Sequence, residues 1–166
     1  MTLEERVARL EDDRAIRDLK MRYLRATDLK QVDELRECLT EDATVAFDGF
    51  PPFDTREAFI AVYEQMGCAP GIFDIHHGGT GTIAFSGPDE ATGQWPLFFH
   101  NIALAQRTLT QMGVHYEDRY VRREGRWWIA ETRSRRTSCL IHTVDEAGAA
   151  KVAVMGEPPA QFGEAG

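Results

Sequence analysis

The sequence predicts a single α+β domain in which helices come first and an antiparallel sheet follows. Three observations support this prediction. Helical spacing of apolar residues is found over residues 3–66, long strand-like segments cover residues 74–140, and turn signals such as Glu124-Gly125 separate those segments. Helices followed by antiparallel strands are typical of the α+β class. The 166 residues fit one domain, with expected bounds of 1–144 and a flexible or docked tail over 145–166.

The first helical region is expected to contain two helices. Its apolar positions form two stripes with helical spacing: Leu3, Val7 and Leu10, then Ile16, Leu19, Tyr23 and Ala26. Continuing the first stripe leads to charged residues, so the two stripes do not share a phase. We therefore expect a short leading helix and a second helix capped at Asp12 or Asp13. Further helices are expected over residues 32–39 and after a cap at Asp54 or Thr55.

Strands are expected over residues 44–47, 74–85, 90–107, 111–123 and 126–140. Residues 86–89 and Glu124-Gly125 are expected to form hairpin turns, and Met112-Gly113 is expected beside another turn. Pro96 predicts a bulge or a sheet edge. Strands of this length curl, so we expect a strongly curved, mostly antiparallel sheet with the helices in its concavity and a conical pocket between them.

Composition excludes several classes of protein. The net charge of −8 argues against a nucleic-acid binder, and no apolar run approaches the ~20 residues of a membrane helix. The charged segment 1–9 predicts no secretory signal. Three dispersed cysteines predict free thiols in a reducing, cytoplasmic compartment. They show no metal-binding spacing, and the sequence contains no glycine-rich phosphate loop, nucleophile elbow or Cys-x-x-Cys motif, so neither a metal nor another cofactor is expected.

Three histidines are candidates for proton transfer. His76 and His77 are neighbours in an expected strand, so only one of them can enter the pocket. His100 interrupts the apolar run that ends at Phe99. If His100 faces the same cavity as one of the pair, two imidazoles converge with a carboxylate and form a proton-transfer set without a metal. The alternative is that each histidine is a hydrogen-bonded interior residue or a surface residue.

Other candidates come from the helices and from the later strands. Tyr23 belongs to the second apolar stripe and needs a partner for its hydroxyl, whereas Asp28, taken alone, reads as a turn or cap residue. The remaining candidates for substrate contacts are His77, Trp95, Phe99 and Tyr116 as lining residues and Arg133 as a ligand for an acidic group.

Several segments resemble SnoaL-like proteins of the nuclear-transport-factor-2-like superfamily, which includes scytalone dehydratase, ketosteroid isomerase and bile-acid dehydratase. The resemblance lies in the opening residues 3–19 with Tyr23-(x4)-Asp28, in His76-His77-Gly78 followed by Ala91-Thr92-Gly93-x-Trp95, and in Gly113-x-x-Tyr116-x-Asp118 with Gly125-Arg126-Trp127. It covers roughly residues 3–139.

This resemblance implies a cone-shaped α+β barrel and a cytosolic homodimer, with a homotrimer as the alternative. The dehydratase members of the superfamily use a pocket tyrosine, an aspartate and one or two histidines without a cofactor. By position, the resemblance assigns these roles to Tyr23, Asp28, His76 and His100.

The resulting hypothesis is a cofactor-independent lyase or isomerase acting on a small hydrophobic carbonyl compound of the cyclic, polyketide or steroid type. His76 would act as base, Asp28 would orient it, Tyr23 would polarise the carbonyl, and His100 would protonate a leaving hydroxyl. A non-catalytic binding or assembly module, or the small subunit of a ring-hydroxylating oxygenase, remains open. Aromatic residues on the outer sheet face also predict a homo-oligomer.

Overall fold

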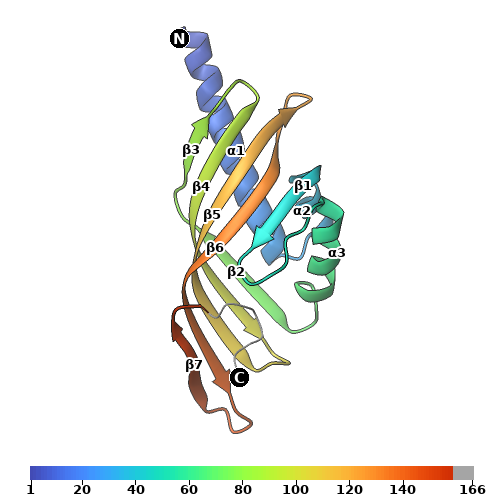
Figure 1. Cartoon of the computed structure of the whole chain (residues 1–166), viewed down its shortest axis with the longest axis vertical. Helices are drawn as coiled ribbons and strands as arrows, with labels where there is room; N and C mark the ends of the chain where they lie inside the picture. Colours follow the sequence, from blue (N-terminus) through green and yellow to red (C-terminus); the bar gives the residue numbers. More distant parts are fainter. Residues whose placement is uncertain (159–166) are drawn as a thin grey trace.

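A computed structural model describes residues 1–158 and shows three helices and seven strands in that range (Figure 1). The helices are α1 (Leu3–Asp28), α2 (Val32–Arg36) and α3 (Arg56–Met66). The strands are β1 (Leu39–Phe47), β2 (Ile72–Gly78), β3 (Thr82–Phe85), β4 (Glu90–Ala103), β5 (Thr108–Arg123), β6 (Arg126–Val144) and β7 (Ala150–Gly156).

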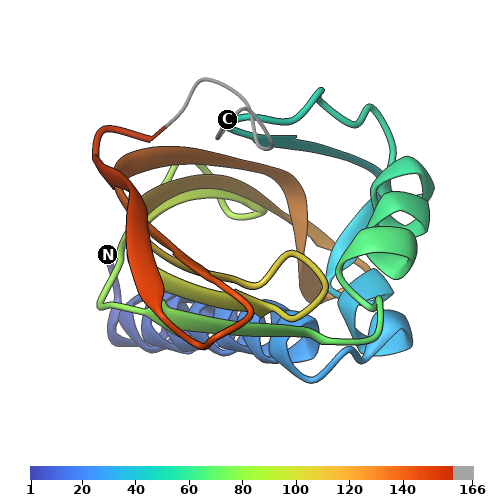
Figure 2. The ribbon, with the colours of Figure 1, turned by 90° about the horizontal axis from the view of Figure 1, so that it is seen from below.

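All seven strands belong to one sheet, in which β1, β6, β5, β4 and β2 follow one another. β3 also pairs with β4, and β7 pairs with β6. β1 runs parallel to β6, whereas the other pairings among the described strands are antiparallel. The view along the long axis shows the sheet curling strongly, with α1 along one side and α3 beside the opening (Figure 2). The expected curved α+β cone is thereby confirmed.

α1 is one continuous helix, so the expected break at Asp12 or Asp13 is wrong. Neither residue caps a second helix, because both side chains are used elsewhere. Asp12 accepts a hydrogen bond from Trp127 Nε1 at 2.9 Å, and Asp13 pairs with Arg17 one turn later at 2.6 Å. The first apolar stripe is exposed, with Leu3 68% accessible, because the N-terminal part of α1 extends beyond the sheet (Figure 1). The second stripe packs on the sheet, so the change of phase marks where the sheet begins to cover α1.

The expected strand 74–85 is in fact two strands, β2 and β3, separated by residues 79–81. A side chain at Gly81 would meet Trp95, because an added Cβ would lie 2.2 Å from its ring. Pro96 of β4 lies opposite this interruption and accepts a hydrogen bond from Gly79 N at 2.8 Å. Since the N and the C=O of one strand residue point to the same side, the missing N–H of Pro96 faces the gap between β2 and β3 and no ladder bond is lost.

The hairpin between β4 and β5 lies earlier than expected. β4 ends at Ala103 and β5 begins at Thr108, so Met112-Gly113 lies within a strand. Arg107 in the turn has a φ of 53°, a left-handed conformation that the sequence did not suggest for this residue type. β1 also begins before Thr44, at Leu39. In the tail, β7 pairs with β6, and residues 159–166 lie outside the described residues.

Strand alternation separates an inner from an outer sheet face. The inner face contributes the large buried aromatic residues Trp95, Tyr116, Tyr120 and Trp127. The outer face exposes apolar residues of β2 and β4, namely Phe73, Ile75, Phe98 and Ile102. A homo-oligomer built through this outer face stays a prediction. Among the described helices, none is both long enough and apolar enough to span a membrane.

Candidate functional site

Asp28 and His76 form a hydrogen-bonded dyad between the end of α1 and the middle of β2. Asp28 Oδ1 lies 2.6 Å from His76 Nδ1, and both carboxylate oxygens accept the backbone N–H of His76, at 3.0 and 3.1 Å. A carboxylate only accepts hydrogen bonds, so in the neutral imidazole Nδ1 carries the proton and Nε2 keeps its lone pair. The side chains are 14% and 24% exposed for His76 and Asp28, so the dyad is partly open to solvent.

Packing fixes the orientation of the imidazole. Phe99 stands opposite His76 in the register of β2 and β4, and the two ring centroids lie 4.8 Å apart. Thr27 Oγ1 lies 3.4 Å from His76 Nδ1, although its hydrogen bond to Leu24 O is much shorter, at 2.6 Å. Tyr63 of α3 donates to Thr27 O at 2.6 Å and so ties α3 to the end of α1. Of the residues expected to line the site, Phe99 therefore touches the dyad directly.

His77 and His100 do not join the dyad. Successive strand residues point to opposite faces, and His76 and Phe99 occupy the inner face. His77 follows His76 and is exposed, whereas His100 follows Phe99 and stands opposite Ile75, an exposed residue of the outer face. The expectation that His100 shares the pocket with His76 is therefore corrected: the two imidazoles lie on different sides of the sheet.

Arg133 also lies on the outer face. It stands opposite Glu117 in the register of β5 and β6, its side chain is 67% exposed, and its Nε lies 2.5 Å from Glu131. The inward position next to it belongs to Thr132, which is fully buried. The expectation that Arg133 binds an acidic substrate group inside the cone is corrected for this reason.

Tyr23, Trp95 and Tyr116 lie deep in the cone and are almost completely buried. Burial raises the pKa of both tyrosines, and the nearby Asp118 carboxylate raises each of them further. Tyr23 therefore points from α1 into the cone, as expected. Its surroundings are those of the hydrophobic core, and it lies next to a buried charged pair that was not predicted from the sequence.

That pair is Lys20 with Asp118, and it organises what we call the deep cluster: Lys20, Trp95, Asp118, Tyr120 and Thr132. Lys20 Nζ lies 2.8 Å from Asp118 Oδ2, and neither side chain is exposed. Tyr120 OH donates to Asp118 at 2.7 Å, Thr132 Oγ1 donates at 2.7 Å, and Trp95 Nε1 donates to Tyr120 OH at 3.0 Å. Burial lowers the pKa of Lys20, while the Asp118 carboxylate acts in the opposite direction.

The sequence did contain a signal for this pair. Lys20 falls on the apolar stripe of α1, four residues after Ile16 and three before Tyr23, where a charged residue needs a buried partner. Asp118 shares its strand face with the aromatic residues Tyr116 and Tyr120.

A second charged group lies beside the dyad. Lys30 Nζ forms an ion pair with Asp74 Oδ2, and Asn101 Nδ2 donates to Asp74 Oδ1 at 2.7 Å. Asp74 precedes His76 by two residues on the same face of β2, and Lys30 follows Asp28 by two residues. We call Asp28, Lys30, Asp74, His76 and Asn101 the rim cluster. Burial raises the pKa of the neighbouring Tyr63, and Cys68 and Asp74 add to this rise.

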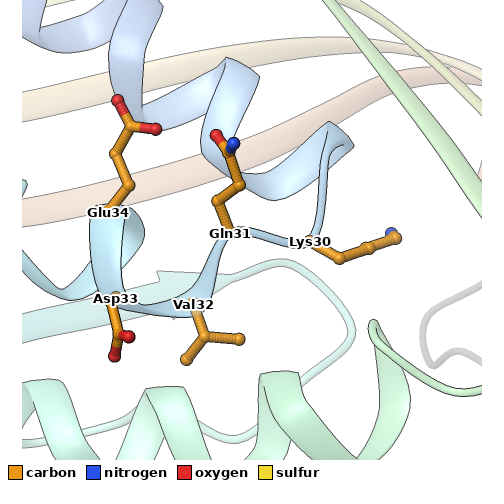
Figure 3. A pocket seen from close by; sticks show the side chains of 5 residues that line it. All are labelled: Lys30, Gln31, Val32, Asp33 and Glu34. Atoms are coloured by element: carbon orange, nitrogen blue, oxygen red, sulfur yellow. The ribbon is translucent and has the colours of Figure 1, made fainter.

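The surface hollows formed by residues 1–158 include two of several hundred cubic ångströms. One, of about 480 Å³, is bounded by residues 30–34, which form the connection after α1 and the start of α2 (Figure 3). The other, of about 420 Å³, lies between α1 and the β5–β6 hairpin and includes Arg22, Arg122 and Trp127. Within residues 1–158, no three histidine, cysteine or carboxylate side chains are grouped so as to hold a metal ion.

Solved structures similar to this chain include two enzymes or enzyme candidates from Novosphingobium. A candidate scytalone dehydratase from Novosphingobium aromaticivorans has a TM-score of 0.75 and 19% identity, covering 95% of this chain and 97% of its own. The hexachlorocyclohexane dehydrochlorinase LinA, type 3, from Novosphingobium barchaimii has a TM-score of 0.72 and 19% identity, covering 92% and 99%.

A third similar structure is ActVI-ORFA from Streptomyces coelicolor, with a TM-score of 0.62 and 13% identity, covering 74% of this chain and 94% of that one. At these identities the likenesses establish the fold. The sequence itself matches the SnoaL-like domain family over residues 8–133, which contain the whole of the dyad, the rim cluster and the deep cluster. The chain therefore belongs to the SnoaL-like domain family.

Proposed function

We propose that this protein is a cofactor-independent lyase or isomerase in which His76 takes a proton from a carbon atom of a small hydrophobic substrate. The observation that carries the proposal is the 2.6 Å contact between Asp28 and His76 Nδ1, which leaves Nε2 free to accept a proton. A partly exposed imidazole that is oriented by a carboxylate is well suited to act as a general base. The similar structures described as a dehydrochlorinase and a candidate dehydratase support this class of chemistry.

The reaction follows from this arrangement. His76 Nε2 accepts a proton from a carbon beside a carbonyl group, and the electron pair of the broken C–H bond moves onto the carbonyl oxygen as an enolate. Asp28 stabilises the imidazolium that forms. The imidazolium then returns the proton. Delivery to a leaving hydroxyl on the β-carbon releases water and leaves a C=C bond, whereas delivery to another carbon completes an isomerisation.

The experiment compares two adjacent histidines. Purified protein is tested for exchange of carbon-bound hydrogen with D₂O and for elimination, on a panel of cyclic ketones and β-hydroxy ketones. The His76→Ala variant should lose about 10²- to 10⁴-fold in rate, the usual contribution of a positioned base. The matched control is His77→Ala, which removes the neighbouring, outward-facing imidazole and should leave the rate unchanged. Equal rates for wild type and His76→Ala would refute the proposal.

A binding or assembly module is the second candidate, because Trp95 fills the interior of the cone. Its side chain is 1% exposed and is fixed by its hydrogen bond to Tyr120. This function predicts that the protein binds compounds of the panel and releases them unchanged, with no exchange of hydrogen. Mass spectrometry of the recovered ligand after incubation in D₂O distinguishes the two functions.

A further inference from the structure

The connection between α1 and α2 directs two side chains onto the same face of β2. Asp28 reaches His76, and Lys30 reaches Asp74 two residues earlier in that strand. The intervening Leu29 is exposed. Residues two apart in a strand lie about 6.6–6.8 Å apart on one face. Lys30 therefore pairs with the inward-facing residue of β2 that precedes His76.

The backbone at Lys30 is unusual for a lysine. Its φ of 58° lies in the left-handed region, which glycine or asparagine adopts at lower cost. Lys30 nonetheless occupies this position, and its side chain forms an ion pair with Asp74 of β2. Figure 3 shows it extending away from the other four residues that bound the hollow, Gln31 to Glu34. The position therefore combines a costly backbone conformation with a long cationic side chain aimed at β2.

Lys30 retains hydrogen-bonding capacity in this arrangement. An ammonium group has three donors, and within residues 1–158 its hydrogen-bond acceptor is Asp74. Asp74 is held from its other oxygen by Asn101 at 2.7 Å. Lys30 is 24% exposed, more than Asp74 at 10%, so the cation is the more accessible partner. The Tyr63 ring lies 5.9 Å from Nζ and covers another side.

We propose that Lys30 binds the oxyanion that develops on the substrate when His76 removes the proton, which makes it a substrate-binding residue of this site. When a carbon beside a carbonyl loses its proton, the negative charge appears on an oxygen two bonds away. A donor for that oxygen must lie within a few ångströms of the base, and Lys30 is paired with Asp74, the next residue along the same face of β2 as His76. Before the substrate arrives, the ammonium group is paired with Asp74, whose other oxygen accepts a hydrogen bond from Asn101, and the substrate oxyanion competes with this carboxylate for Lys30.

This inference rests on the proposed function and names its substrate class: compounds whose deprotonation places charge on oxygen, such as cyclic ketones, as opposed to hydrocarbons without a carbonyl group. It also assigns to Lys30 the stabilisation of the carbonyl oxygen, the role that was expected for Tyr23 from the sequence. Lys20, the lysine within α1, is buried in the core against Asp118 and has no exposed surface.

The test is a binding measurement without turnover. The probe is 4-nitrophenol, fully ionised at the pH of the experiment, whose phenolate oxygen imitates an enolate oxygen. Nitrobenzene is the neutral reference of similar shape. The ratio of their dissociation constants for each variant isolates the contribution of the oxyanion. Wild type should prefer the phenolate, and Lys30→Met should reduce this preference by about 10- to 100-fold, in the range of hydrogen bonds between charged groups.

Three further variants separate substrate binding from a structural role. Lys30→Arg should keep most of the preference. Asp74→Asn should increase it, because the carboxylate that competes for the ammonium group is gone. Lys151→Met removes an exposed lysine of β7 and should change nothing. If Lys30 only anchored the connection between α1 and α2 to β2, Lys30→Met and Asp74→Asn would change the preference for the phenolate in the same direction and by similar factors.

Several outcomes overturn the inference: no preference for the phenolate in wild type, no effect of Lys30→Met, or equal losses in Lys30→Met and Asp74→Asn. These outcomes differ from failure of the proposed function, which is measured by the turnover of His76→Ala. A protein that binds the phenolate through Lys30 without turnover would keep this inference and refute the lyase or isomerase activity.

Discussion

The rim cluster and the deep cluster are built from the same chemical pair. In each, a lysine from α1 or its C-terminal connection meets an aspartate on the inner face of the sheet: Lys30 with Asp74 at the rim, Lys20 with Asp118 in the interior. Exposure separates them, because the rim pair is 24% and 10% exposed and the deep pair is fully buried. A lysine in a solvent-exposed ion pair can leave its aspartate and bind a ligand, whereas a fully buried ion pair contributes to the stability of the fold.

The largest expected effect is on stability, in the deep cluster. Lys20→Met leaves the Asp118 charge buried without its counter-ion, so we expect the free energy of unfolding to fall by about 3–5 kcal/mol. Lys30→Met should change it by no more than about 1 kcal/mol, since Asp74 keeps Asn101 and some contact with water. Denaturant titrations of both variants measure the difference. Equal losses would remove the distinction between the clusters.

A control for this prediction is the double variant Lys20→Met with Asp118→Asn. It removes both charges, so it should be more stable than Lys20→Met alone.

The four tyrosines of the chain provide a pH test of the same distinction. Burial raises the pKa of Tyr23, Tyr116 and Tyr120 in the interior and that of Tyr63 near the rim above the ordinary value of 10. The folded protein then keeps phenolic protons that the unfolded chain loses. Stability is therefore complete below pH 10 and falls as the pH rises above it, by about 1.4 kcal/mol per pH unit for each group.

Absorbance at 295 nm, followed with and without denaturant, measures this behaviour. Without denaturant, phenolate should appear together with unfolding, whereas the unfolded chain should ionise near pH 10. Gradual ionisation of a folded protein near pH 10 would show that the interior admits water.

The smallest effects are expected from two neighbours on β6. Thr132 donates to Asp118 inside the cone, and Thr132→Val should lower the free energy of unfolding by about 1–3 kcal/mol, because it leaves a buried carboxylate oxygen without that donor. Arg133→Ala removes an exposed side chain paired with Glu131 and should cost about 0–1 kcal/mol. Thermal or denaturant unfolding measures both. A larger loss from Arg133→Ala would show that the outer face is covered.

Much of the fold could be predicted because apolar periodicity reports burial. The existence of β4, β5 and β6 and the cap at Thr55 follow from alternation and turn residues, although the hairpin between β4 and β5 was expected too late and β7 was not expected as a strand. The continuity of α1 could not be predicted in this way, since the phase change after Leu10 looks the same whether a helix ends or leaves its sheet. The gap between β2 and β3 depends on the close contact of Gly81 with Trp95, which lies beyond local sequence.

Site residues that belong to a motif could be predicted from the sequence. Site residues whose position depends on which side of a strand faces inward could not. Tyr23-(x4)-Asp28 and His76 were chosen from sequence, and the structure brings Asp28 and His76 together. His100 was placed on the wrong face because the interrupted apolar run does not reveal which neighbour faces inward. Lys30, Asp74 and Asn101 come from separate parts of the chain: the register of β2 and β4 places Asp74 opposite Asn101, and the connection after α1 brings Lys30 to Asp74.

The pairing of β1 with β6 bears on the order in which the chain assembles during synthesis. β1 and α1 are made early, but β6, which pairs with β1, and β5, which carries Asp118, are made late. Until they appear, β1 lacks its strand partner and Lys20 of α1 lacks its buried counter-ion. Local helix formation is therefore possible early, whereas the cone closes only when most of the chain has been made, and closure depends on contacts between distant segments, which form slowly.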